Sequence, residues 1–135
     1  MKTLRRIIPL VALGALFGVC IDTRPPPASL SVGGAEISGL LVSYCWSSAC
    51  GGVCADGINR TPPPVLVRAA APAQARVLIE QPRELHVRVG PSLERVTEVP
   101  RDRLVLAAGL NVVSVNAWWA RGDAYYTFAV EVEQP

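Results

Sequence analysis

The sequence predicts an all-β domain, a sandwich or a barrel, that follows an N-terminal targeting segment. Proline and glycine recur at short intervals after residue 28, and strand-length runs rich in Val, Leu and Ile lie between them. Residues alternate between apolar and polar in the last two runs, as in half-buried strands. The predicted strands are residues 29–32, 36–46, 65–68, 76–80, 84–89, 93–99, 103–106, 110–119 and 125–133.

The two C-terminal runs form the best-defined predicted hairpin, closed by a loop over residues 120–124. Alternation gathers apolar side chains on one face of each run, namely Val113, Val115, Ala117 and Trp119 in the first and Tyr126, Phe128, Val130 and Val132 in the second. The opposite face, which includes Thr127 and Ala129, is predicted to meet solvent. Gly33 and Gly34 are suited to closing a smaller hairpin between residues 29–32 and the next strand.

Residues 1–19 have the pattern of a signal peptide. Lys2, Arg5 and Arg6 precede an apolar run over residues 7–21, which is shorter than the ~20 residues of a membrane-spanning helix. An uncleaved membrane anchor is the alternative. Removing residues 1–19 leaves a chain long enough for one domain.

Cys20 ends this apolar run and is the predicted lipidation site. A hydrophobic leader that ends in small residues and a cysteine resembles a bacterial lipoprotein signal, in which the cysteine becomes the lipidated first residue. Residues 20–28 would then be the anchor and a spacer, since Pro25, Pro26 and Pro27 favour a stiff extended conformation. Ordinary cleavage near residues 12–14 is the alternative, and it would leave Cys20 as a free or paired thiol.

Short motifs carry a resemblance over residues 30–133. They are Tyr44-Cys45-Trp46, Cys54-Ala55-Asp56 with a proline-rich loop after it, and a closing hairpin with Trp119, Gly122-Asp123-Ala124-Tyr125-Tyr126 and Phe128. In these the chain resembles small secreted bacterial lipoproteins, most of which have no assigned function. The resemblance implies an immunoglobulin-like β-sandwich of about 7–9 antiparallel strands over residues 29–135, and it brings no catalytic residues.

Three clustered cysteines are the unusual chemical feature of the domain. An extracytoplasmic compartment favours a disulfide, and the sequence favours Cys45–Cys54, with Cys50 as the alternative partner. Cys20–Cys50 becomes possible if Cys20 is not lipidated. The alternative function is a thiol or metal-binding module at Cys45, Cys50 and Cys54, although structural zinc prefers four ligands. We therefore predict no metal and no cofactor.

The remaining composition argues against several functions. Once the leader is removed, ten Lys and Arg face eleven Asp and Glu, which gives a formal charge of −1 and predicts no nucleic-acid binding. His86 is the only histidine, and no motif of nucleophilic catalysis accompanies it. The sequence thus predicts a protein that is not an enzyme.

The predicted function is that of a non-enzymatic binding or structural module in the bacterial cell envelope. It would be held on the extracytoplasmic side of a membrane through Cys20, and its partner would be an unknown protein or carbohydrate. Adjacent strand residues face opposite ways, so Trp118 is predicted outward when Trp119 is buried. The candidate partner-binding residues are Trp118, Tyr125 across the hairpin, and Arg121 in the hairpin loop.

Overall fold

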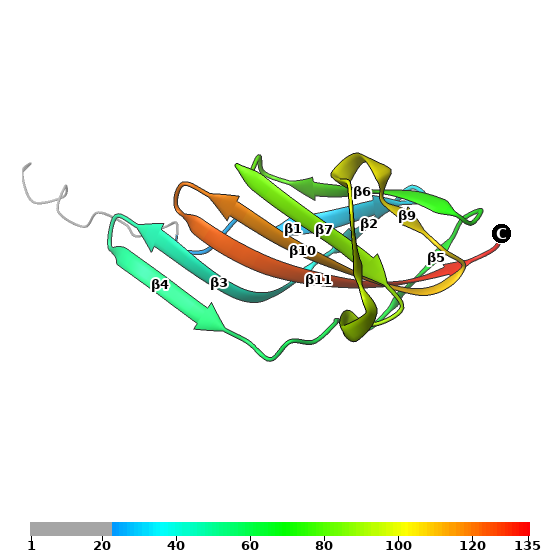
Figure 1. The fold of residues 1–135 in the computed structure, drawn as a ribbon, viewed down its shortest axis with the longest axis horizontal. Coiled ribbons are helices and arrows are strands. Elements are labelled where there is room, and N and C mark those ends of the chain that lie inside the picture. The colour runs from blue at the N-terminus through cyan, green and yellow to red at the C-terminus, as the bar shows by residue number, and fades with distance from the viewer. Residues whose placement is uncertain (1–22) are drawn as a thin grey trace, which may run out of the picture.

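The computed structural model describes residues 23–135, which fold into two packed β-sheets and contain no α-helix (Figure 1). This confirms the predicted all-β, two-sheet architecture. The strands are β1 (Ala28–Val32), β2 (Ala35–Ser38), β3 (Leu40–Ser48), β4 (Gly51–Asp56), β5 (Val65–Arg68), β6 (Ala73–Ile79), β7 (Glu84–Gly90), β8 (Thr97–Val99), β9 (Val105–Leu106), β10 (Gly109–Trp119) and β11 (Gly122–Glu133). Two short 3-10 turns, η1 (Leu93–Arg95) and η2 (Arg101–Arg103), flank β8.

The smaller sheet has the strand order β2-β1-β6-β9. Its β1–β2 hairpin is closed by Gly33 and Gly34, whose φ angles of 56° and 78° are those of a two-residue type I′ turn. The predicted small hairpin is therefore confirmed. Chain crossings between the sheets occur after β2, β5, β6, β8 and β9.

The larger sheet has the order β4-β3-β11-β10-β7-β8, and β5 pairs in parallel with β11 beyond the end of β3. The described residues thus hold eleven strands, more than the 7–9 expected, and one pairing is parallel. The predicted strand over residues 36–46 is divided at Gly39, where a Cβ atom would lie 2.7 Å from Cζ of Phe128. The strand β4 was not predicted at all.

The hydrophobic core lies between the sheets, and β10 and β11 supply much of it. Its fully buried side chains include Leu30, Val77, Val87, Leu104, Leu106, Val113, Val115, Tyr126, Phe128 and Val130. The prediction that Thr127 and Ala129 meet solvent was wrong, because both are buried on the outer face of β11. The segment between β4 and β5 covers this part of the sheet, where the hydroxyl of Thr127 donates a hydrogen bond to the carbonyl of Arg60.

The end of the predicted spacer packs onto the sandwich. Pro25 is buried, the carbonyl of Pro26 accepts a hydrogen bond from the hydroxyl of Tyr126, and Ala28 is already part of β1. Residues 1–22, with the predicted signal peptide and Cys20, lie outside the described residues. Within residues 23–135 there is no helix of the length and apolar character needed to cross a membrane.

The turn from β10 to β11 depends on a glycine at position 122. The φ angle of Gly122 is 153°, and a Cβ atom there would lie 1.9 Å from the carbonyl oxygen of Cys45. Gly122→Ala is therefore expected to lower the free energy of unfolding by at least about 2 kcal/mol, measured by urea titration. Gly52→Ala is the control, because nothing lies within 4 Å of that position. Equal stability of the two variants would contradict the close approach of β3 to this turn.

Candidate functional site

Strand register places one row of side chains across five strands of the larger sheet. Trp118 of β10 lies directly opposite Glu84 of β7 on one side and Asp123 of β11 on the other. Asp123 in turn pairs with Cys45 of β3, and Cys45 pairs with Cys54 of β4. Because Ala117 and Ala124, the neighbours of Trp118 and Asp123 in sequence, are buried in the interior, this row faces outward.

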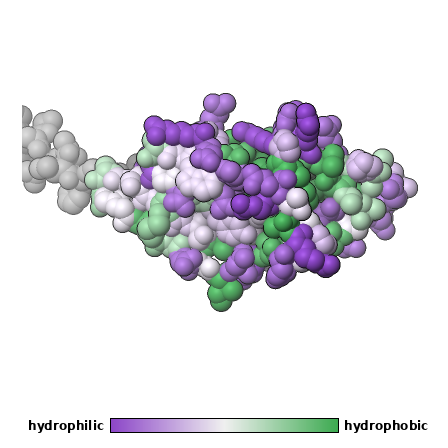
Figure 2. Space-filling view, viewed as in Figure 1, coloured by the Kyte–Doolittle hydropathy of each residue, from purple (hydrophilic) through white to green (hydrophobic). Residues whose placement is uncertain are grey.

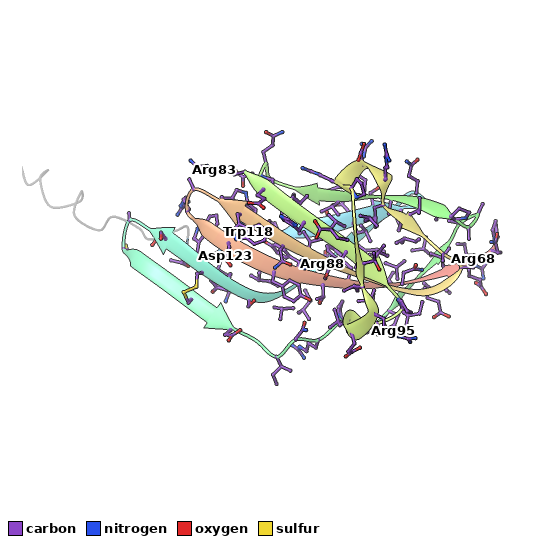
Figure 3. All side chains as sticks on the ribbon, in the orientation of Figure 1. Arg68, Arg83, Arg88, Arg95, Trp118 and Asp123 are labelled. Carbon is purple, nitrogen blue, oxygen red and sulfur yellow. A yellow bond between two sulfur atoms is a disulfide. The ribbon has the colours of Figure 1, made fainter. Side chains whose placement is uncertain are left out.

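A second row on the same outer face runs from His86 of β7 through Asn116 of β10 to Tyr125 of β11. We call the surface formed by Glu84, His86, Asn116, Trp118, Asp123 and Tyr125 the Trp118 face. Figure 3 shows Trp118, Asp123 and Arg88 on the side of the sheet toward the viewer. In the same view, hydrophilic side chains spread over much of the molecular surface (Figure 2).

Trp118 is 38% exposed although it stands on β10, a strand of the central hairpin whose middle is buried. Its ring contacts the ring of His86, with the centroids 5.3 Å apart and the planes at 81°. Such an edge-to-face contact fixes the orientation of an aromatic side chain without burying it. The structure therefore brings Trp118 and Tyr125 to one surface and presents the indole to solvent.

His86 is the centre of a hydrogen-bonded network beside Trp118. Its Nε2 lies 2.6 Å from Oε1 of Glu84, and its Nδ1 lies 2.8 Å from Oε1 of Glu98 on β8. The hydrogen bond to Glu84 and then that to Glu98 raise the pKa of His86 above its usual value of 6.5. Arg88 completes the network, since its guanidinium donates to Oδ1 of Asn116 at 3.1 Å and lies 3.8 Å from Glu98.

Arg121, the third candidate partner-binding residue, does not join the Trp118 face. Its guanidinium lies 5.1 Å from the ring centroid of Trp46, and its Nε donates a hydrogen bond to the carbonyl of Ser47 at 3.0 Å. Trp46 packs edge-to-face against Trp119, with the ring centroids 5.4 Å apart. Trp119 packs toward the core, so Arg121 lies on the opposite side of the sheet from Trp118.

A hollow of about 570 Å³ lies on that inner side, where the proline-rich segment meets the two tryptophans. The hollow is lined by Pro25–Pro27, Trp46, Trp119 and Arg121, together with Arg24 and Arg83. The indole N–H of Trp119 donates to the carbonyl of Glu80 at 3.1 Å. The indole N–H of Trp46 is buried and meets no acceptor among the residues described.

Cys45 and Cys54 form a disulfide across β3 and β4, which confirms the favoured pairing. Their Cα atoms are 4.1 Å apart, as in a directly opposite pair that makes no backbone hydrogen bond. None of the cysteines between residues 23 and 135 is free, Cys50 included. Two of the three clustered sulfur atoms thus bind each other, and no three His, Cys, Asp or Glu side chains in this part of the chain are grouped to hold a metal ion.

The sequence did not assign Glu84, Glu98 and Asp123 to the site, and it gave His86 no role. Alternation does place Glu84, His86 and Arg88 on one face of their strand. The missing information was which strands flank Trp118. That pairing depends on β7 lying beside β10, and no local sequence signal specifies it.

Comparisons of the chain with protein-family models, with curated proteins and with solved structures found no significant match.

The disulfide is expected to stabilise the β3–β4 hairpin locally, because every residue of β4 is exposed. In a variant with Cys45→Ala and Cys54→Ala, loss of the cross-link should raise amide hydrogen exchange in Gly51–Asp56 by about 100-fold, while exchange in β10 and β11 changes little. The paired control is Ser43→Ala with Asp56→Ala, the next directly opposite pair on the same face. Unchanged exchange in β4 of the cysteine variant would contradict a structural role of the disulfide.

The raised pKa of His86 makes stability depend on pH. Folding strengthens proton binding, so the stabilisation is fully present below pH 6.5 and is lost as pH rises through the higher pKa of the folded state. The free energy of unfolding of the wild type should therefore fall, relative to that of His86→Gln, as the pH rises from below 6.5 into the alkaline range. Denaturant titrations of both proteins across this range measure the difference. Parallel curves would show that the imidazole gains nothing from Glu84 and Glu98.

Proposed function

We propose that the protein is an exported, non-enzymatic binding module of the bacterial cell envelope and that the Trp118 face is its binding surface. The observation that carries this proposal is the exposure of Trp118. A large aromatic side chain that is held in one orientation, yet left 38% exposed, is typical of a recognition residue. Polar groups that can direct a partner surround it, namely Glu84, Asn116, Asp123 and Tyr125.

The leader and the disulfide support export. Residues 1–19 have the order of charges and apolar residues of a signal peptide, and a disulfide is stable in an oxidising compartment. We further infer an immunoglobulin-like topology and kinship with small secreted bacterial lipoproteins. The two packed sheets and the repeated chain crossings between them support the first of these inferences.

Cys20 is the proposed site of lipid attachment. The described chain begins three residues after it, and Pro25 is buried on the sandwich, so a lipid on Cys20 would hold the domain close to the membrane surface. One observation favours a second use of this residue. Cys50 is not free, Cys45 and Cys54 bind each other, and Cys20 is the fourth cysteine of the sequence. A Cys20–Cys50 disulfide and lipidation of Cys20 exclude each other.

Fractionation of cells that express the full chain separates these two uses of Cys20. Anchoring predicts that the wild type stays with the membrane fraction and that Cys20→Ser is released, because the lipid on Cys20 is then what holds the mature chain there. The mass of the mature wild type should then exceed that of residues 20–135 by the mass of the lipid.

Cys50→Ser is the matched control. Under anchoring this variant remains in the membrane fraction. If Cys20 instead pairs with Cys50, the wild type carries no lipid, and Cys50→Ser gains a thiol at Cys20 that an alkylating reagent modifies. Membrane association that is unchanged in Cys20→Ser would refute the anchor.

A further inference from the structure

The position of Trp118 between two carboxylates indicates which ligand the Trp118 face recognises. We infer, on the basis of the proposed binding function, that this face takes a cationic side chain, arginine or lysine, of a partner protein. The cation would lie over the indole of Trp118, and Glu84 and Asp123 would be its counter-charges.

Register alone puts the three side chains together. Glu84 and Asp123 are the directly opposite neighbours of Trp118 on the two flanking strands. On one face of an antiparallel pair, the Cβ atoms of such neighbours lie about 4.5–5.5 Å apart. A cation within about 6 Å of the indole centroid is therefore also within reach of both carboxylates.

Both carboxylates can accept further hydrogen bonds. Asp123 is exposed, and its carboxylate makes no hydrogen bond or ion pair with another described residue. The side chain of Glu84 is 64% exposed, and its contact with His86 uses Oε1 only. A guanidinium or ammonium group supplies the donors that these oxygens lack.

The charge of the surrounding surface favours the same class of ligand. Glu98 and Asp56 lie on this side of the sheet as well. Glu98 is on β8 beside His86, and Asp56 is on β4, two strands from Tyr125. Two basic side chains stand at these strand positions, and both are already engaged. Asn116 and Glu98 engage Arg88, and Glu84 and Glu98 engage His86. An anionic ligand would be repelled here, whereas the domain as a whole is close to neutral.

The shape of the surface argues for a side chain of a protein over a free small molecule. Trp118 lines neither the hollow beside Trp46 nor the hollow along β6 and η2. Small ligands bind tightly in concave sites that surround them, whereas an open face with one exposed anchor suits a protein interface. The remaining groups that enclose Trp118 and the bound cation would then be supplied by the partner protein.

The test uses a short acetylated peptide with one arginine, and the same peptide with citrulline, which has the shape of arginine but no charge. The exported full-length protein should bind the arginine peptide weakly, with a dissociation constant of about 1 mM, because the contact is exposed. Four changes should each weaken binding by about tenfold. They are the citrulline peptide, about 0.5 M NaCl, the variant Trp118→Ala, and the double variant Glu84→Gln with Asp123→Asn. NMR titration measures these constants.

Glu131→Gln is the control, because it removes an exposed carboxylate from the outer face of β11 at the far end of the strand. This variant should leave the affinity for the arginine peptide unchanged within about twofold. Trp118→Phe keeps an aromatic ring, so partial binding by this variant shows that the ring makes the contact. Amide NMR signals of β10 and β11 that stay dispersed in Trp118→Ala show that its loss of binding is not a folding defect. Equal affinity for the citrulline peptide, or for the double carboxylate variant, overturns the inference.

A neutral oligosaccharide, chitohexaose, distinguishes failure of this inference from failure of the proposed function. If chitohexaose binds and Trp118→Ala abolishes that binding, while the arginine peptide does not bind, the binding module stands and its ligand is a glycan. If neither probe perturbs the Trp118 face, both the cationic ligand and the assignment of this face as a binding surface are wrong.

Discussion

The pairing of β10 with β11 is the interaction on which the rest of the larger sheet depends. It runs without a break from Gly109 opposite Val132 to Trp119 opposite Gly122. The strands β7, β3 and β5 each pair directly with one of these two strands, and β8 and β4 attach through β7 and β3. Both faces of the hairpin are buried along much of its length, so its register is strongly specified.

The composition of the Trp118 face follows from this register. A shift of β10 by one residue would turn Trp118 inward and place Ala117 between the two carboxylates. Residues that are far apart in the sequence, such as Cys45, Glu84 and Trp118, meet because their strands lie side by side in a fixed alignment. The Cys45–Cys54 disulfide covalently joins the last two strands of the row, beside Asp123. The surface is therefore preorganised before any partner arrives.

The sequence predicted the features that depend on local alternation. Alternation in β10 correctly predicted that Val113, Val115 and Ala117 face the core and that Trp118 faces outward. The two-glycine hairpin and the Cys45–Cys54 pairing were also predicted correctly. The strand β4 was missed because Gly51-Gly52-Val53-Cys54 has no apolar alternation, and all of its residues are exposed. Burial of Thr127 depends on a segment that crosses the sheet from Arg60, which alternation cannot reveal.

The candidate site was predictable only in part, because local alternation does not show which distant strands lie side by side. Trp118 and Tyr125 belong to one hairpin, so the sequence could place them on one surface. Arg121 makes a cation–π contact with Trp46 and a hydrogen bond to Ser47, both on a strand distant in sequence. The carboxylate of Glu84 reaches Trp118 through the pairing of β7 with β10, which is likewise a non-local contact.

The three indole N–H signals of Trp46, Trp118 and Trp119 offer the most direct test of a recognition surface on the outer face of the larger sheet. They can be assigned by single substitutions to Phe and followed in NMR spectra of the full-length protein as the arginine peptide is added. Only Trp118 is on the outer face, so its signal should shift progressively while those of Trp46 and Trp119 remain in place. Shifts confined to Trp46 and Trp119 would contradict the account, because they would place recognition on the inner side of the sheet.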